Sequence, residues 1–109
     1  MKKIAIIIAS RQGLAPALTI HRELPGTELF YAGEGEANPC TSIDSIPAFI
    51  ATNFTRYEGL VFIGALGICV RAIAPCTQSK YTAPAVVCID SMGRNAISVL
   101  SGHVGGANA

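Results

Sequence analysis

The sequence from residue 59 to residue 75 reads GLVFIGALGICVRAIAP and contains an apolar strand, a glycine loop and a helical pattern. Residues 59–63 are apolar and rich in strand-forming side chains. The loop at residues 64–67 leads into apolar residues at helical spacing, and Pro75 ends the pattern. A strand followed directly by a helix is the unit from which parallel α/β sheets are built.

The same alternation extends along the rest of the chain. The expected strands are residues 3–9, 27–32, 59–63, 84–90 and 96–100. The expected helices cover residues 14–24, 43–54 with Pro47 in the first turn, and 68–73. We expect loops at residues 33–42 and 76–83, and a hairpin of the last two strands around a turn at 91–95. The sequence therefore predicts one Rossmann-like, three-layer α/β domain over residues 1–109, with a mostly parallel sheet, helices on both faces and a C-terminal hairpin.

The composition excludes several classes of protein. Hydrophobic residues make up 50% of the chain and charged residues 14%, against roughly 25% charged in an average domain, so much of the chain must be buried. Apolar runs such as Ile4–Ala9 are too short for a membrane span of about 20 residues. A net charge of +1 provides no basic face for nucleic acid. The start Met1-Lys2-Lys3 leads into a strand and not into a signal peptide, so we expect a cytoplasmic protein.

The cysteines are at positions 40, 69, 76 and 88, without a C-x-x-C pair and with only two histidines to complete a metal site. We therefore expect no metal site and four free, mostly buried thiols. Cys69 falls in a predicted helix, where packing is a better interpretation than nucleophilic catalysis.

Ligands of parallel α/β sheets bind beyond the carboxyl ends of the strands. We expect three glycine-containing loops to meet there, at residues 10–13, 64–67 and 102–106. The amides at Gly67 begin a helix and can bind an anion, and Arg71 lies one turn further on, where a guanidinium can hold a carboxylate or phosphate. The alternative is that these glycines only permit a tight turn and that Arg71 is solvated. The dinucleotide-binding fingerprint is absent.

Residues 101–106 read SGHVGG and place one histidine among three glycines. In such a loop His103 can titrate near neutral pH and act as a general acid or base, and neighbouring amides can hold an oxyanion. The alternative is a structural hydrogen bond. Weaker candidates are His21 and Arg94, interpreted as solvated, and Asp90, interpreted as bonding its own turn.

Several segments together resemble the cobalt-precorrin-5A hydrolase family, CbiG. They are residues 62–75 (FIGALGICVRAIAP), Lys80, residues 84–87 (PAVV), Asp90, Gly93-Arg94 and residues 100–108 (LSGHVGGAN). The resemblance covers nearly the whole chain and is weakest in the first half. The family usually has an aspartate where this sequence has Ala83. The sequence ends inside the glycine–histidine motif, where the family continues into a helix and further domains, so we expect a fragment of a longer protein.

The resemblance implies an enzyme of anaerobic cobalamin biosynthesis. Its substrate would be a cobalt tetrapyrrole with peripheral carboxylates and a lactone, which is hydrolysed with release of acetaldehyde to give cobalt-precorrin-5B. The cobalt arrives with the substrate, so no cofactor is expected. His103 would be the catalytic base. The expected substrate-binding residues are Gly13, Gly64, Gly67, Arg71, Lys80, Ser101, Gly102, Gly105, Gly106 and Asn108.

Two other functions stay open at this stage. One is a non-catalytic corrinoid-binding module whose chemistry depends on further domains or on other pathway proteins. The other is a small phosphate- or nucleotide-binding module that uses residues 64–67 as an anion nest. A homo-oligomer is compatible with each of them.

Overall fold

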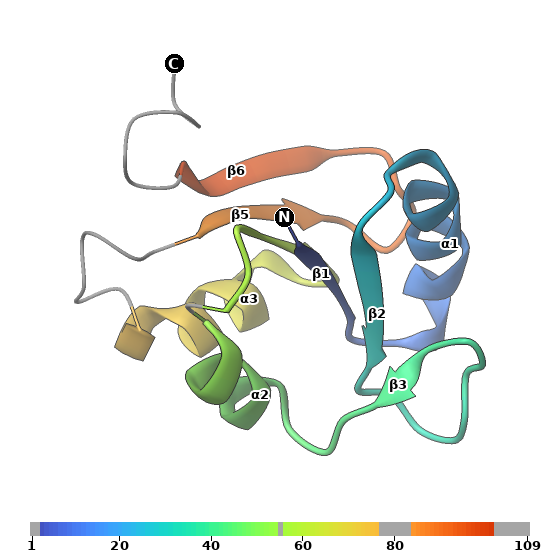
Figure 1. Cartoon of the computed structure of the whole chain (residues 1–109), viewed down its shortest axis with the longest axis horizontal. Coiled ribbons are helices and arrows are strands. Elements are labelled where there is room, and N and C mark those ends of the chain that lie inside the picture. The colour runs from blue at the N-terminus through green and yellow to red at the C-terminus, as the bar shows by residue number, and fades with distance from the viewer. Residues whose placement is uncertain (1–2, 55, 77–83, 102–109) are drawn as a thin grey trace.

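A computed structural model describes residues 3–54, 56–76 and 84–101 (Figure 1). The strands are β1 (Ile4–Ile8), β2 (Thr27–Tyr31), β3 (Thr41–Ser42), β4 (Gly59–Ile63), β5 (Ala85–Ile89) and β6 (Ala96–Ser101). The α-helices are α1 (Leu14–Glu23), α2 (Ile46–Asn53) and α3 (Leu66–Ile73), with short 3-10 turns at Arg11–Gly13 and Ala74–Cys76. None of the described helices has both the length and the hydropathy that a membrane crossing needs.

The six strands form one sheet in the order β3-β2-β1-β4-β5-β6. Strands β1 to β5 run parallel to their neighbours, and β6 is antiparallel to β5. β1 lies inside the sheet, between β2 and β4, and its residues 5–8 are all fully buried. A β-branched run that is apolar on both faces suits an inner parallel strand, which is covered on both sides. The chain extends from β1 first toward β3 and then, on the other side, toward β6.

Helices cover both faces of the sheet, so the predicted three-layer α/β fold is confirmed (Figure 1). On one face Ile6 and Ile8 pack with Ala17 of α1. On the other face the alternate residues of β1, Ala5 and Ile7, pack with residues of α2 and α3. The alternation of side chains along a strand divides β1 between two cores.

The structure differs from the expected elements around residue 41. Thr41 and Ser42 pair with the end of β2 as the short edge strand β3, so the prediction of an unbroken loop over residues 33–42 is wrong there. Both residues are exposed, and two paired residues of this kind carry no apolar pattern to signal a strand. Helix α2 begins at Ile46, after Ser45, whose hydroxyl accepts a hydrogen bond from the Ala48 amide (3.3 Å).

The predicted C-terminal hairpin is confirmed, and its direction decides where the chain goes next. Ala85 pairs with Ser101 and Ile89 pairs with Ala96, so β6 returns to the edge where the parallel strands begin. Ser101 is therefore separated from the carboxyl edge by five strand residues, about 16 Å. The loop at residues 102–106, predicted at the carboxyl edge, lies outside the described residues. Ser101, directly before it, lies at the opposite edge, because an antiparallel strand ends where its parallel neighbours begin.

Gly13 allows α1 to approach the two central strands closely. It is buried at the start of the helix, and a Cβ atom built on it would lie 2.8 Å from Cγ2 of Ile63 and 3.1 Å from Cγ2 of Ile8. Gly67, in contrast, is exposed in the first turn of α3, and a Cβ atom there would meet nothing within 4 Å. The two glycines therefore differ in what they contribute to stability.

We predict that Gly13→Ala lowers the free energy of unfolding by about 1–3 kcal/mol, because the added methyl group overpacks the contact with β1 and β4. Gly67→Ala is the matched control and should leave stability unchanged or raise it by up to about 1 kcal/mol, as alanine in a helix does. Urea denaturation followed by circular dichroism measures both changes. Equal stability of the two variants would contradict the packing role of Gly13.

Candidate functional site

The loops that follow β1, β4 and β5 lie side by side at the carboxyl edge of the sheet. The Ala9 amide donates to the Ile63 carbonyl (3.1 Å), and the Gly64 amide donates to the Ile89 carbonyl (2.9 Å). These bonds continue the sheet by one residue past the strand ends. The chain order reverses between β1 and β4, which makes this edge the topological switch point where α/β sheets bind ligands.

Gly64 is buried within this edge. A Cβ atom on it would lie 2.9 Å from Cβ of Ala9, so only glycine lets the two loops approach this closely. Its amide is bonded to Ile89, and its carbonyl accepts a hydrogen bond from the Cys88 thiol (3.6 Å). Gly64 therefore shapes the loop. Its amide is already bonded to Ile89 and is not available to an anion, contrary to the anion nest considered for residues 64–67.

Helix α3 presents an open first turn at the same edge. The amides of Ile68 and Cys69 donate to the Ala65 carbonyl, which leaves the amides of Leu66 and Gly67 outside the helix's own hydrogen bonds. Unpaired amides and the positive end of the helix favour an anion at this position. Of the predicted binding glycines within the described part of the chain, Gly67 is the one whose placement suits contact with a ligand.

The outer face of α3 combines a cation with exposed aliphatic side chains. Arg71 is exposed one turn after Gly67, on the same side of the helix. Leu66, Ile68 and Val70 are 40–46% exposed. A face of this composition suits a ligand that has an apolar body and an acidic group.

A cavity of about 400 Å³ lies at the ends of β1 and β2, lined by Ala9, Ser10, Arg11, Tyr31, Gly33 and Glu34. The Arg11 guanidinium donates to the Glu36 carbonyl (2.8 Å), and its Cζ atom lies 5.7 Å from the centre of the Tyr31 ring. From this loop the sequence predicts Gly13 as a binding residue, whereas in the structure Gly13 packs against the core and Arg11 lines the cavity. The missed signal was a cationic side chain directly after the first strand.

A second, larger groove of about 500 Å³ lies between α1 and the turn that joins β5 to β6. Its lining residues are Ala15, Pro16, Thr19, Ile20, Ile89, Met92, Gly93, Arg94, Asn95 and Ala96. Arg94 is exposed in a loop, as the sequence predicts, but its place on this groove is not among the predictions. A hairpin whose first strand is parallel to the sheet must place its turn at the carboxyl edge, so the predicted hairpin already contained the signal that was missed.

Asp90 closes this turn, as predicted. Its Oδ1 atom accepts a hydrogen bond from the Arg94 amide (2.9 Å), and its Oδ2 atom accepts one from the Asn95 side chain (3.2 Å). The bond from the Arg94 amide is the main reason why the pKa of Asp90 lies below its ordinary value of 3.8. The carboxylate thereby fixes the backbone that carries Arg94.

The buried thiols of this region are structural. All four cysteines are free, and Cys69 and Cys88 are buried. Burial, with a contribution from the nearby Cys88 thiol, raises the pKa of Cys69 to about 12. A thiol with this pKa stays protonated at neutral pH, which agrees with a packing role. Among residues 3–54, 56–76 and 84–101, no three His, Cys, Asp or Glu side chains are grouped as a metal site requires.

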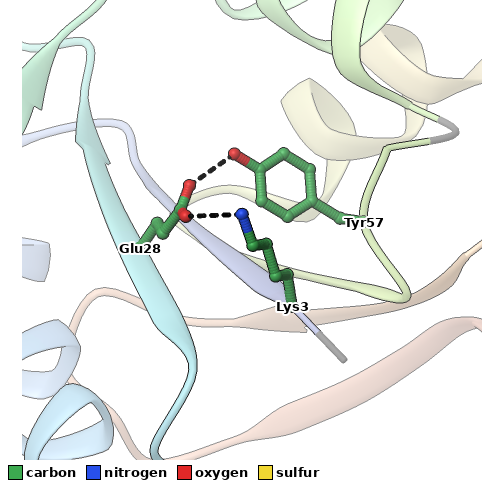
Figure 2. A network of polar contacts seen from close by, with 3 residues as sticks. All are labelled: Lys3, Glu28 and Tyr57. Carbon is green, nitrogen blue, oxygen red and sulfur yellow. Dashed lines mark hydrogen bonds and ion pairs between the residues drawn. The ribbon is translucent and has the colours of Figure 1, made fainter. Parts of the chain in front are cut away.

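A polar network at the amino edge ties the starts of three strands together (Figure 2). Glu28 of β2 accepts a hydrogen bond from the Tyr57 hydroxyl (2.7 Å) and lies 3.7 Å from the Lys3 ammonium. Burial and the bond to Glu28 raise the pKa of Tyr57 to about 12. His21 is exposed, as predicted, and its Nδ1 atom lies 2.6 Å from the Thr27 hydroxyl. These contacts are structural and lie away from the carboxyl edge.

The predicted site residues are thus only partly brought together. Gly13, Gly64 and Gly67 belong to the carboxyl edge, Arg71 lies on the outer face of α3, and Ser101 is at the amino edge. The remaining predicted site residues lie outside the described residues; they are Lys80, Gly102, His103, Gly105, Gly106 and Asn108.

The sheet order and the reversal between β1 and β4 define a domain of the doubly wound α/β class. The family model described as "Cobalamin synthesis G N-terminal" matches residues 48–109, more than half of the chain. The chain belongs to this family.

Two curated relatives carry the name cobalt-precorrin-5A hydrolase. The protein from Priestia megaterium is 38% identical over 95% of this chain, and the chain spans 29% of that relative's length. The protein from Salmonella typhimurium is 59% identical over 51% of this chain and 16% of its own length. A crystal structure of a cobalamin biosynthesis protein G homologue from Sulfolobus solfataricus matches with a TM-score of 0.67 and 29% identity, over 94% of this chain and 30% of that one. The chain therefore corresponds to less than a third of these relatives.

We predict that Asp90→Ala destabilises the protein at neutral pH and that this effect disappears in acid. The folded-state pKa of Asp90 is depressed, so its stabilisation is present above pH 3.8 and is lost as the pH falls through the lower, folded-state value. Melting temperatures of wild type and variant, measured between pH 7 and pH 2.5, should converge at the acidic end. Asp44→Ala, which removes an exposed carboxylate outside the turn, controls for net charge. A difference that persists unchanged at pH 2.5 would contradict the stabilisation of the turn by the Asp90 carboxylate.

Proposed function

We propose that the chain forms the substrate-binding part, with the catalytic histidine, of a cobalt-precorrin-5A hydrolase of cobalamin biosynthesis. The observation that carries the proposal is the 38% identity, over 95% of this chain, to a protein of that name. The chain spans 29% of that relative, so the activity of the whole protein is part of the proposal.

The chemistry of the carboxyl edge supports a tetrapyrrole as the ligand. Such a substrate combines an apolar ring with several peripheral carboxylates. The first turn of α3 offers the amide of Gly67 to an anion, and the exposed guanidinium of Arg71 can bind a carboxylate through two parallel hydrogen bonds. The exposed side chains of Leu66 and Ile68 provide apolar surface beside them.

In the proposed reaction His103 removes a proton from water, and the hydroxide adds to the lactone carbonyl. Collapse of the tetrahedral oxyanion breaks the acyl carbon–oxygen bond and leaves a carboxylate and a free alcohol. Removal of the alcohol proton then forms the carbonyl group of acetaldehyde and breaks the adjacent carbon–carbon bond. The electron pair of that bond passes into the conjugated macrocycle, so no external oxidant is required, and the cobalt ion is part of the substrate.

One observation favours a second candidate function, a corrinoid-binding module without catalysis of its own. Ser101, two residues before the proposed base, lies at the opposite edge of the sheet from Gly67, and β6 alone separates it from the carboxyl edge by about 16 Å. In this reading the chain binds the macrocycle at the carboxyl edge, and the base comes from the remaining part of a longer enzyme.

We predict that the purified chain releases acetaldehyde from cobalt-precorrin-5A under anaerobic conditions. His103→Ala should lower the rate at least about 100-fold, because a general base contributes this much or more. Arg71→Ala should weaken substrate binding about tenfold, as expected for a lost charge-assisted hydrogen bond. Coupled detection of acetaldehyde measures turnover, and the absorbance of the corrinoid measures binding.

His21→Ala is the matched control, since His21 is an exposed histidine bonded to Thr27 and distant from the carboxyl edge. Its rate should equal that of wild type. Saturable corrinoid binding without acetaldehyde would support the module. A chain that neither binds the corrinoid nor releases acetaldehyde would contradict both functions.

A further inference from the structure

The groove between α1 and the β5–β6 turn has the size and composition of a small-molecule site. Its volume is about 500 Å³, within the range of roughly 300–1,000 Å³ that ligand pockets occupy. The apolar part of the lining consists of Ala15, Pro16, Ile20, Ile89, Met92 and Ala96. Thr19, Arg94 and Asn95 supply the polar groups. A mostly apolar surface with a few polar groups binds a ligand that is itself mostly apolar.

The turn that forms one wall of the groove is held in place before any ligand arrives. Asp90 accepts hydrogen bonds from the Arg94 amide and the Asn95 side chain, and its carbonyl accepts one from the Gly93 amide (2.9 Å). Gly93 has a φ of 73°, which favours glycine, and a Cβ atom built on it would be 3.4 Å from Cβ of Pro16 in α1. A fixed wall lowers the entropy that binding must overcome.

Arg94 is the cation of the groove and is not engaged in the protein. It is exposed, and within residues 3–54, 56–76 and 84–101 its guanidinium has neither an ion pair nor a hydrogen bond. The carboxylate of Asp90, the nearest acidic group in sequence, accepts hydrogen bonds from the Arg94 amide and the Asn95 side chain within the turn. A free guanidinium at the rim of an apolar groove suits a carboxylate on an otherwise apolar ligand.

Met92 provides exposed apolar surface beside Arg94 in the same groove. It is 66% exposed, the most exposed of the large hydrophobic residues in the described chain. A flexible thioether side chain adapts its shape to a flat or irregular apolar partner. Together, Met92 and Arg94 offer an apolar contact and a charge from one rigid turn.

A phosphate or nucleotide fits this groove poorly. Phosphate sites use several free backbone amides that point at one place. Here the Gly93 and Arg94 amides are both bonded to Asp90. The groove lacks the amide nest that residues 64–67 were predicted to form on the opposite side of the edge.

We propose that this groove binds the rim of a cobalt tetrapyrrole, with the ring edge against Met92 and Pro16 and a peripheral carboxylate paired with Arg94. The inference rests on the proposed function for the identity of the ring system. It adds a second binding position at the carboxyl edge, on the opposite face of the sheet from Gly67. The ligand would span the switch point between α1 and α3.

The test is an absorbance titration of the whole chain with two probes, cobyrinic acid, a cobalt corrinoid with free peripheral carboxylates, and its heptamethyl ester. Arg94→Ala should weaken binding of the acid about tenfold and leave binding of the ester unchanged, because the ester has no carboxylate to pair. Met92→Glu should weaken binding of the acid by a similar factor through charge repulsion. The controls are Arg22→Ala, in the last turn of α1, and Leu24→Glu, directly after that helix, which make the same kinds of change at exposed positions outside the groove. Thermal melting of each variant verifies its fold.

Wild-type affinity for the acid in both Arg94→Ala and Met92→Glu would overturn the proposal, and so would the absence of saturable binding by the wild type. The acetaldehyde assay decides the proposed function separately. If the groove variants weaken corrinoid binding but the chain releases no acetaldehyde, the binding site stands and catalysis by the chain is rejected. Acetaldehyde release that is insensitive to both groove variants would keep the function and reject the site.

Discussion

The burial of β1 on both faces is the constraint on which the other elements depend. Its isoleucines alternate between two cores, one beneath α1 and one beneath α2 and α3. An inner strand of this kind must have a parallel neighbour on each side, and β2 and β4 take these positions in matching register, with Ile4 opposite both Thr27 and Gly59. The close approach of α1 at Gly13 then holds the helix against Ile8 and Ile63.

This arrangement also places the site. Because the chain proceeds in one direction from β1 to β3 and in the other from β4 to β6, the helices that follow β1 and β4 lie on opposite faces of the sheet, and the carboxyl edge between these strands is its topological switch point. Arg11, Gly67 and the turn of Arg94 all lie at this edge, in three segments that are distant in the sequence, and Arg11 and Arg94 line two separate cavities. In the proposed function, Arg11 and Arg94 supply positive charge at this edge for the carboxylates of the substrate.

The direction of β6 is the largest correction to the sequence-based picture. The sequence predicts the hairpin and a site at the carboxyl edge, but the strand that returns from the turn leads away from that edge. An antiparallel strand begins at the edge where its parallel neighbours end and ends at the edge where they begin. It brings Arg94 to the carboxyl edge and takes Ser101 away from it. The pairing of β3 was missed for a different reason, since its two exposed residues have no apolar periodicity.

The sequence by itself determined the class of fold, the positions of the main strands and helices, and the family. These follow from local signals: the apolar run of β1, the helical spacing after Gly67, the proline in the first turn of α2, and Gly93 in the turn between β5 and β6. Only the tertiary structure decided which loop residues face a ligand and which face the core. Gly13 and Gly64 have the same composition signal as Gly67, but neighbouring side chains from other strands surround the first two and leave the third open. A contact between residues that are far apart in the sequence has no local pattern, so it becomes known only when the sheet is assembled.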